Sequence, residues 1–399
     1  MFCRPVPGAW DAWAAQLSSG KDVFVAKRPT IYDVARRASV SIATVSFTFR
    51  QPHRVSEATR TLVTAAAREL GYVPSASARG LASGRTGAIG LYSYDYYGRA
   101  GTGAASLQQD DSALLAEGVF SDKSNEDFRL FPLYHDEVQR GVEMECRRRG
   151  YVLMIGEGRG KASEADINEI AGRVDGLAVF PNTFSTEILK RIASRIPVVE
   201  LAVPAMETGQ HCVFVENTYG ARELTRHLIR HHGHTSITFV GPAGSPDREH
   251  RFAGYSEAME EAGLKAGSLA APGRDDAGRL KDPLPDPARE SDEAIRWLRD
   301  AGSLPDAFVC SNDAEALLFV DALKRAGLSV PGDVAVTGFD GLAAGRMSRP
   351  ALTTVRQPMI ALGRAAAEIL IKQIANPGGE TIARELPVEL VLSESCGCG

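Results

Sequence analysis

The chain has 399 residues, of which 44% are hydrophobic and 24% charged, and it carries a net charge of −5. This composition excludes a disordered or fibrous protein and indicates a globular chain long enough for two or three domains. No apolar run of about 18 residues is present, so the sequence predicts no membrane span. Residues 1–26 lack the compact apolar segment of a signal peptide. We expect them to form a poorly ordered extension of a cytoplasmic protein.

The charge is unevenly distributed along the chain. Residues 27–86 contain ten Lys or Arg and three acidic residues, a net charge of +7, which leaves −12 for the remainder. A basic module of this size favours phosphate backbones, whereas an acidic body argues against nonspecific coating of nucleic acid. The pattern predicts a small DNA-binding module fused to a larger body of different character.

Residues 27–73 predict three short helices with a basic surface. Each is preceded by a residue suited to N-capping, and Thr30 has Asp33 three positions later, as in a capping box. The predicted inward-facing residues are Ile31, Val34, Ala35, Ala38, Val45, Phe49, Leu62, Val63, Ala66 and Leu70. Three short helices of this kind indicate a helix-turn-helix domain whose second helix, about 42–49, lies in the major groove.

Residues 74–86 are rich in small side chains and contain one large apolar residue, Leu81, and two arginines. Alone, this segment cannot bury enough surface to hold a helix. Against DNA, two such segments can pack together and wedge a leucine into the minor groove. The alternative is a flexible linker in which the leucine is incidental.

From Ala88 onward, apolar strands alternate with amphipathic helices, which predicts an α/β body of doubly wound parallel sheets. The length suffices for two lobes with a ligand cleft at the carboxyl ends of their strands. Residues 98–127 are rich in Gly, Ser and acidic residues, and we interpret them as a mobile insertion.

Two sets of motifs resemble the lactose-repressor (LacI/GalR) family of transcription regulators. The first is TIYDVARRASVSIATVS…VSEATR…AAARELGYVPSASARGLASGRTGAIGL, and the second includes SNDAEALLFVDALKRAGLSVPGDVAVTGFDG. The resemblance implies an effector-controlled homodimer that reads a palindromic operator. It also implies a periplasmic-binding-protein-like core at 87–395. Its lobes are expected at about 88–202 with 358–377, and at about 203–357 with 380–395.

The resemblance also assigns the DNA contacts by position. Ile42 and Ala43 are the expected base-reading residues, supported by Thr44 and Ser46. The residues expected to contact backbone phosphates are Ser41, Thr30, Tyr32 and Ser56. In the hinge segment, 74–86, the expected contacts are Ala78 and Leu81.

The sequence departs from the family pattern in three places. Phe47 stands where many relatives have Arg, so it cannot grip guanine but can touch a thymine methyl group. Arg50-Gln51 replaces the usual Asn-Gly, and Arg50 joins the expected DNA contacts. Gly80 precedes the hinge leucine and weakens a helix there by about 1 kcal/mol relative to Ala.

Three residues after predicted strands or at a helix start are candidate effector contacts: Arg251, Asn312 and Asp340. Small polar ligands such as sugars need a few converging charged or amide groups, and the resemblance places these three at effector-contact positions. Structural roles compete, because Asp313 can cap a helix and Asp340 can shape its turn. Tyr94 and Asn182 are weaker candidates.

The histidines at 227, 231, 232 and 234 raise the question of a metal site, and His227 and His231 have i, i+4 spacing. The pair lacks a nearby Glu and suits a helix C-terminus electrostatically, so we predict no metal and no cofactor. Cys396-Gly397-Cys398 could bind a metal or oxidise, but two thiols without partners make a poor site, so we interpret this segment as a free tail.

Two other functions were weighed against a regulator, which the resemblance makes a repressor or, less often, an activator. A transport solute-binding protein would need export and has no use for a basic helix-turn-helix. An enzyme of this fold would need a catalytic motif, and the sequence has neither GxxxxGK[ST] nor GxSxG. The sequence therefore favours a DNA-binding regulator without enzymatic activity.

Overall fold

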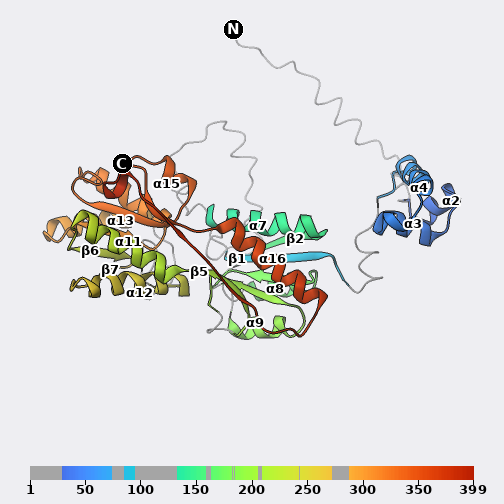
Figure 1. Ribbon diagram of the computed structural model, residues 1–399, viewed down its shortest axis with the longest axis horizontal. Helices are drawn as coiled ribbons and strands as arrows, with labels where there is room; N and C mark the ends of the chain where they lie inside the picture. The colour runs from blue at the N-terminus through green and yellow to red at the C-terminus, as the bar shows by residue number, and fades with distance from the viewer. Residues whose placement is uncertain are drawn as a thin grey trace, which may run out of the picture. The chain divides into compact units, whose positions relative to one another are not determined.

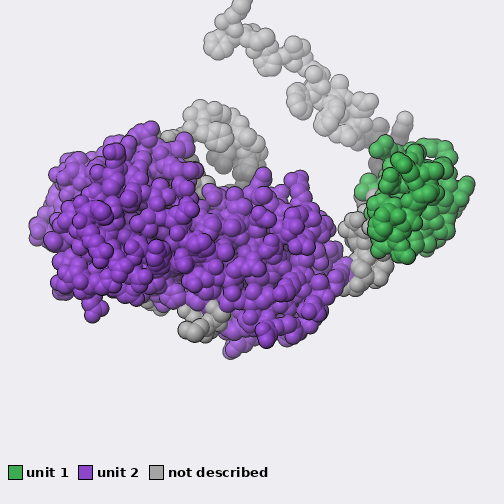
Figure 2. Space-filling view, in the orientation of Figure 1, with its two compact units in different colours: residues 1–79 green, residues 80–399 purple. Residues whose placement is uncertain are grey.

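The computed structural model forms two compact units, residues 1–79 and 80–399 (Figure 2). It describes residues 29–73, 85–94, 133–158, 163–181, 183, 185–204, 209–241, 243–271 and 287–399. The predicted extension 1–26, the insertion 98–127, Ala78, Leu81 and Asn182 lie outside the described residues, and only the backbone is described at Arg50 and Tyr94.

Over residues 29–73, the first unit contains the three predicted helices and one short 3-10 turn: α2 (Ile31–Arg37), α3 (Ile42–Arg50), η1 (Pro52–Arg54) and α4 (Glu57–Leu70). The predicted caps are present. The Asp33 carboxylate accepts from the Thr30 amide at 2.9 Å, and Ser41 Oγ accepts from the Thr44 amide at 3.1 Å. Ser56 Oγ accepts from the Thr59 amide at 3.3 Å. These side chains satisfy amide groups that a helix start leaves unpaired.

The helices enclose a core of their own, made by Val34, Ala35, Ala38, Val45, Val63, Ala66 and Ala67. Phe49 and Leu70 pack against it as predicted. The prediction was wrong for Leu62, which is 57% exposed. The neighbouring Val63 faces the core instead. The buried face of α4 consists of Val63, Ala66 and Ala67, and it does not include every apolar residue of the helix.

The second unit contains two six-stranded sheets, and among the described strands every neighbouring pair is parallel except β10 with β12. The first has the order β11-β5-β4-β3-β1-β2. Its strands are β1 (Ala88–Tyr94), β2 (Val152–Gly158), β3 (Gly176–Val179), β4 (Val198–Leu201), β5 (His211–Val215) and β11 (Ala383–Leu386). The second has the order β12-β10-β9-β8-β6-β7. Its strands are β6 (Ile237–Val240), β7 (Gly267–Leu269), β8 (Ala307–Cys310), β9 (Ala335–Asp340), β10 (Thr353–Arg356) and β12 (Glu389–Val391).

Helices pack on both faces of each sheet, as the alternating pattern predicted (Figure 1). In the first lobe these are α7 (Leu133–Arg149), α8 (Ser163–Ala171), α9 (Thr186–Ala193) and α16 (Met359–Ala375). In the second they are α11 (Asn217–His232), α12 (Pro246–Glu261), α13 (Pro287–Asp300), α14 (Asp313–Arg325) and α15 (Ala343–Met347). A last 3-10 turn, η5, spans Glu394–Cys396. Together the two lobes form the expected α/β body.

The chain crosses between the sheets three times. It passes from β5 to β6 through α11, from β10 to β11 through α16, and from β11 to β12 directly. The predicted lobe boundary at about 202 is therefore wrong, because β5 belongs to the first sheet. The assignment of 380–395 to the second lobe is wrong for β11 and correct for β12. Both β5 and β11 complete the first sheet, where they pair in parallel with each other.

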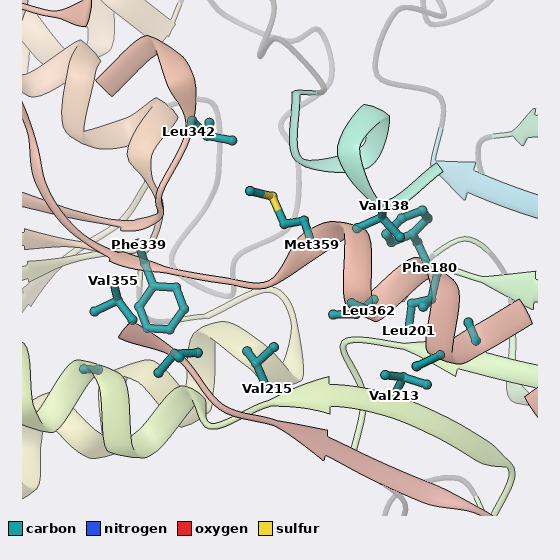
Figure 3. Close-up of a cluster of buried hydrophobic side chains, with 14 of the residues drawn as sticks. Val138, Phe180, Leu201, Val213, Val215, Phe339, Leu342, Val355, Met359 and Leu362 are labelled. Atoms are coloured by element: carbon teal, nitrogen blue, oxygen red, sulfur yellow. The ribbon is translucent and has the colours of Figure 1, made fainter. Parts of the chain in front are cut away.

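One hydrophobic cluster runs through both lobes (Figure 3). Val138 and Phe180 come from the first lobe, and Phe339 and Val355 from the second. Met359, at the start of α16, lies between these groups in the view. The crossing segments are therefore part of a continuous core.

Two helix pairs pack closely through glycine. A Cβ on Gly363 of α16 would lie 1.9 Å from the Val138 carbonyl oxygen of α7, and one on Gly254 of α12 would lie 2.1 Å from that of Thr218 on α11. Neither approach leaves room for a side chain. Among the described helices, none is both long and apolar enough to cross a membrane.

Candidate functional site

The first unit presents α3 with an exposed N-terminal surface. Ile42 is 42% exposed and Phe47 37%, although both are apolar, and Ala43 is exposed beside them. The other exposed predicted contacts are Thr30, Tyr32, Ser41 and Ser56. Thr44 and Ser46 are half-buried. Large apolar side chains held in solvent at the start of a helix suit contact with base edges and thymine methyl groups.

Phe47 has a cationic neighbour. The Arg54 guanidinium carbon lies 4.8 Å from the centre of its ring, within range of a cation–π interaction. Arg36, Arg37 and Arg54 are all exposed. Arg36 lies 3.8 Å from Asp33, and Arg37 pairs with Glu69 across the helices at 2.7 Å. The surface therefore combines an apolar reading edge with positive charge, as binding to a polyanionic groove requires.

In the second unit, a buried polar cluster surrounds Arg251 of α12, which is 4% exposed. Its Nε donates to Asn217 Oδ1 at 2.8 Å, and its Nη1 donates to the Ser311 carbonyl at 2.6 Å. The guanidinium also lies 3.3 Å from an Asp247 oxygen and 3.6 Å from an Asp340 oxygen. It thus joins two helices to the carboxyl ends of β8 and β9.

Asp340 ends β9 with φ at 130°, a backbone conformation that L-residues rarely adopt. Its carboxylate accepts from Gln357 Nε2 at 2.6 Å, just after β10. Burial raises the pKa of Asp340 to about 8, although the Arg251 charge acts in the opposite direction. A strained carboxylate at a strand end, with an arginine beside it, is suited to accept hydrogen bonds from a polar ligand.

Asn312 and Asp313 have structural partners. Asn312 Oδ1 accepts from the Glu315 amide at 2.9 Å and so caps α14, the role that we had considered for Asp313. Asp313 is buried and accepts from the Leu342 amide at 2.7 Å, which fixes the turn after Asp340. Burial raises the pKa of Asp313 to about 6. The structure therefore brings Arg251 and Asp340 together and gives Asn312 a capping role.

Two further residues of this site escaped the sequence analysis. Asp247 is one helical turn before Arg251, a spacing that could have suggested an ion pair. His135, in the first turns of α7, has its ring 4.3 Å from that of Phe180, which directly follows β3. Burial lowers the pKa of His135 to about 4, and the charge of Asp247 counteracts this. The first lobe therefore contributes a neutral imidazole and aromatic rings near the acidic and basic groups of the second.

A helix-turn-helix unit joined to a two-lobed body, with a buried polar cluster at the strand ends, defines a ligand-responsive transcription regulator. Residues 30–75 match the sequence model of bacterial regulatory proteins of the lacI family, and residues 225–396 match that of a periplasmic binding protein-like domain. The HTH-type transcriptional regulator GalR of Salmonella typhimurium is 31% identical over 350 residues, covering 86% of this chain and 88% of GalR. The ribose operon repressor of Escherichia coli is 31% identical over 355 residues, covering 87% of this chain and 94% of the repressor. The chain belongs to the LacI family.

Solved structures support the same architecture. The Lac repressor dimer bound to operator and the anti-inducer ONPF has a TM-score of 0.69 at 22% identity, covering 93% of this chain and 99% of that one. The complex of the transcriptional regulator CelR with cellobiose has a TM-score of 0.59 at 25% identity, covering 92% and 100%. The predicted fold class, with a helix-turn-helix domain and a periplasmic-binding-protein-like core, is confirmed.

Proposed function

We propose that this protein is a repressor that binds a palindromic operator as a homodimer and changes its operator affinity when a small carbohydrate binds between the lobes. The observation that carries the ligand site is the Arg251–Asp340 pair. Both side chains are buried at the carboxyl ends of parallel strands, where ligands bind in open α/β sheets.

The chemistry of the cluster suits a sugar. The Asp340 carboxyl group, protonated below a pKa of about 8, can donate to one hydroxyl group and accept from another, and the Arg251 guanidinium donates to hydroxyl or ring oxygens. The rings of Phe180, Tyr134 and His135 contact one another and offer an apolar surface for the face of a pyranose or furanose. Relatives support the ligand class, since CelR was solved with cellobiose and one LacI-family regulator with ribose.

The two lobes offer a means of coupling. A ligand held by Arg251 and Asp340 on one lobe and by His135 on the other would favour one angle between them. Since the linker at 74–86 leads into β1 of the first lobe, a change in this angle would alter the separation of the two DNA-binding units in a dimer. Operator affinity changes only to the extent that the ligand binds the two lobe arrangements differently.

The DNA-binding residues that we propose are those on the exposed surface of α3 and its flanks. Ile42, Ala43 and Phe47 would read base edges, and Ser41, Tyr32 and Ser56 would contact phosphates. Arg50, Ala78 and Leu81 complete the set by resemblance to the family.

The test combines ligand screening with operator selection. Thermal unfolding is followed with ribose, cellobiose and other mono- and disaccharides, and any sugar that raises the midpoint is then included in selection of duplexes from a random pool. We expect dyad-symmetric sequences whose enrichment depends on the sugar. Enrichment of no symmetric sequence over scrambled DNA, with or without any sugar, would reject the proposal.

A further inference from the structure

Four sulfur- and nitrogen-containing side chains converge where α11 ends and the C-terminal tail returns to it: His227, His232, Cys396 and Cys398. The Nε2 atoms of the two histidines are 3.1 Å apart. Cys398 Sγ lies 3.4 Å from His227 Nε2 and 3.3 Å from His232 Nε2, and Cys396 Sγ lies 3.8 Å from His227 Nε2. All four candidate ligand atoms lie within 4.8 Å of one another.

The tail is held in place by its own contacts, so the interpretation of Cys396-Gly397-Cys398 as a free tail was wrong. Ser395 is buried, and its hydroxyl donates to the Val336 carbonyl of β9 at 2.6 Å. The Ser395 amide donates to the Ala351 carbonyl, and Cys396 is 2% exposed. Gly397, with φ at 97°, turns the chain so that Cys398 also faces the histidines.

The helix end supplies the other half of the cluster. Gly233 ends α11 in the left-handed conformation, and His232 is the last helical residue. The exposed His231 stacks on His227 but is not among the converging groups. The pair that meets is therefore His227 and His232, five positions apart.

The spacing fits the coordination of one metal ion. With Zn–S of about 2.3 Å and Zn–N of about 2.0–2.1 Å, a tetrahedral site places ligand atoms roughly 3.3–3.8 Å apart. Of the six pairs of candidate ligand atoms, the four given above are 3.1–3.8 Å apart, and the other two lie within 4.8 Å. Two thiolates and two neutral imidazoles also cancel the charge of a divalent ion, which suits a partly buried site.

We propose that His227, His232, Cys396 and Cys398 bind a zinc ion as a Cys2His2 structural site. Tetrahedral sulfur and nitrogen ligands select zinc over harder divalent cations. All four positions come from side chains, so the site is closed and structural, without an open catalytic position. On binding, both thiols release their protons to solvent. The Thr353 hydroxyl, 3.0 Å from Cys396 Sγ, is placed to support the thiolate.

The location gives the ion a role in the second lobe. α11 carries Asn217, the partner of Arg251, at its other end, and β9, to which Ser395 is bonded, ends in Asp340. A zinc ion here would fasten the tail to α11 and stiffen two elements that hold the polar cluster.

The test uses untagged full-length protein, reduced and stripped with a chelator. We expect Zn²⁺ titration to reach one ion per chain, and Co²⁺ to give intense visible bands typical of tetrahedral sites together with thiolate charge-transfer absorption. Cys398→Ser and His232→Asn should lose stoichiometric uptake and the thiolate bands. His231→Gln, on the same helix but outside the cluster, should retain both.

A second measurement guards against variants that fail to fold. In wild-type protein, Zn²⁺ should slow alkylation of Cys398, detected by mass spectrometry, whereas in His232→Asn it should not. The proposal would be overturned if wild-type protein took up less than one ion per chain or if its Co²⁺ spectrum lacked thiolate bands. It would also be overturned if His232→Asn took up as much metal as wild type, or if Zn²⁺ did not slow alkylation of Cys398 in wild type.

Discussion

Arg251 donates from Nε to Asn217 Oδ1 at 2.8 Å and thereby ties α12 to the first residue of α11. Asn217 follows β5 by two positions, at the first crossing between the lobes. The arginine that we assign to the ligand therefore also holds the segment that connects the two sheets. This contact offers a direct route from the polar cluster to the angle between the lobes.

Arg251→Ala should abolish the response to a sugar that the screen identifies while leaving operator binding intact. Because the substitution leaves the buried Asp247 carboxylate without its cation, we also expect a loss of about 3–5 kcal/mol in the free energy of unfolding. Denaturant unfolding and sugar titration of the operator complex measure the two effects. Arg289→Ala, at an exposed ion pair, is the control. An unchanged sugar titration would remove Arg251 from the site.

Asp340→Asn should change how stability depends on pH. With its pKa raised from 3.8 to about 8, Asp340 retains a proton in the folded protein at pH values where the unfolded chain has released it. Its contribution to stability therefore falls as the pH rises from about 4 to about 8. The unfolding temperature of the variant minus that of wild type should therefore be higher at pH 8 than at pH 4. An equal difference at both pH values would contradict the assignment.

His135→Gln should have the opposite dependence. The pKa of His135 is lowered to about 4 by burial, so the unfolded chain takes up a proton at this position before the folded one does. The free energy of unfolding of wild type therefore decreases as the pH falls from 6.5 towards about 4, and it should decrease less for the His135→Gln variant. Thermal unfolding at pH 7 and pH 5 measures this, with the exposed His53→Gln as the comparison.

Phe47→Ala should relax the choice of base at one position in each half-site. An exposed phenyl ring can discriminate through a thymine methyl group, and a single mismatched pair typically costs about 1–3 kcal/mol. Competition between operators that differ at each position measures the effect. A uniform loss on all sequences would instead indicate that Phe47 only stabilises the unit, through Arg54.

Leu81→Ala tests the hinge segment, of which residues 74–84 lie outside the described part of the chain. We expect specific operator binding to weaken far more than nonspecific binding, since a minor-groove wedge forms only on a bent, specific site. Gel-shift titrations on the selected operator and on scrambled DNA distinguish the two. Equal losses on both would count against a wedge.

Local signals allowed much of the fold to be predicted. The caps Thr30, Ser41 and Ser56 act within three residues of their partners, so spacing alone identifies them. The apolar strands of both sheets are equally visible. β11 was missed because its residues alternate between exposed and half-buried positions at the edge of a sheet. Because β11 was not predicted, the sequence did not show that the C-terminal segment adds a strand to the first sheet before it adds one to the second.

Long-range contacts explain what the sequence did not show. The i, i+4 spacing suggested His227 and His231 as a possible pair of metal ligands. The cysteines of the proposed site lie about 170 positions away from His227, in the C-terminal tail, and Cys398 is one of them. Asp340 and Arg251 were predicted because the resemblance places them at effector-contact positions and each lies near the end or the start of a recognisable element. His135 was missed because a histidine near a helix start has no distinctive pattern until Phe180 and Asp247 are brought to it.

The three crossings also set the order in which the protein can fold during synthesis. The first sheet lacks its edge strand until Leu386 has left the ribosome, and the second lacks its own until Val391 has. The helix-turn-helix unit, finished at Leu70, has a separate core and depends on neither. A nascent chain can therefore contain a folded DNA-binding module long before the ligand-binding lobes that would control it are complete.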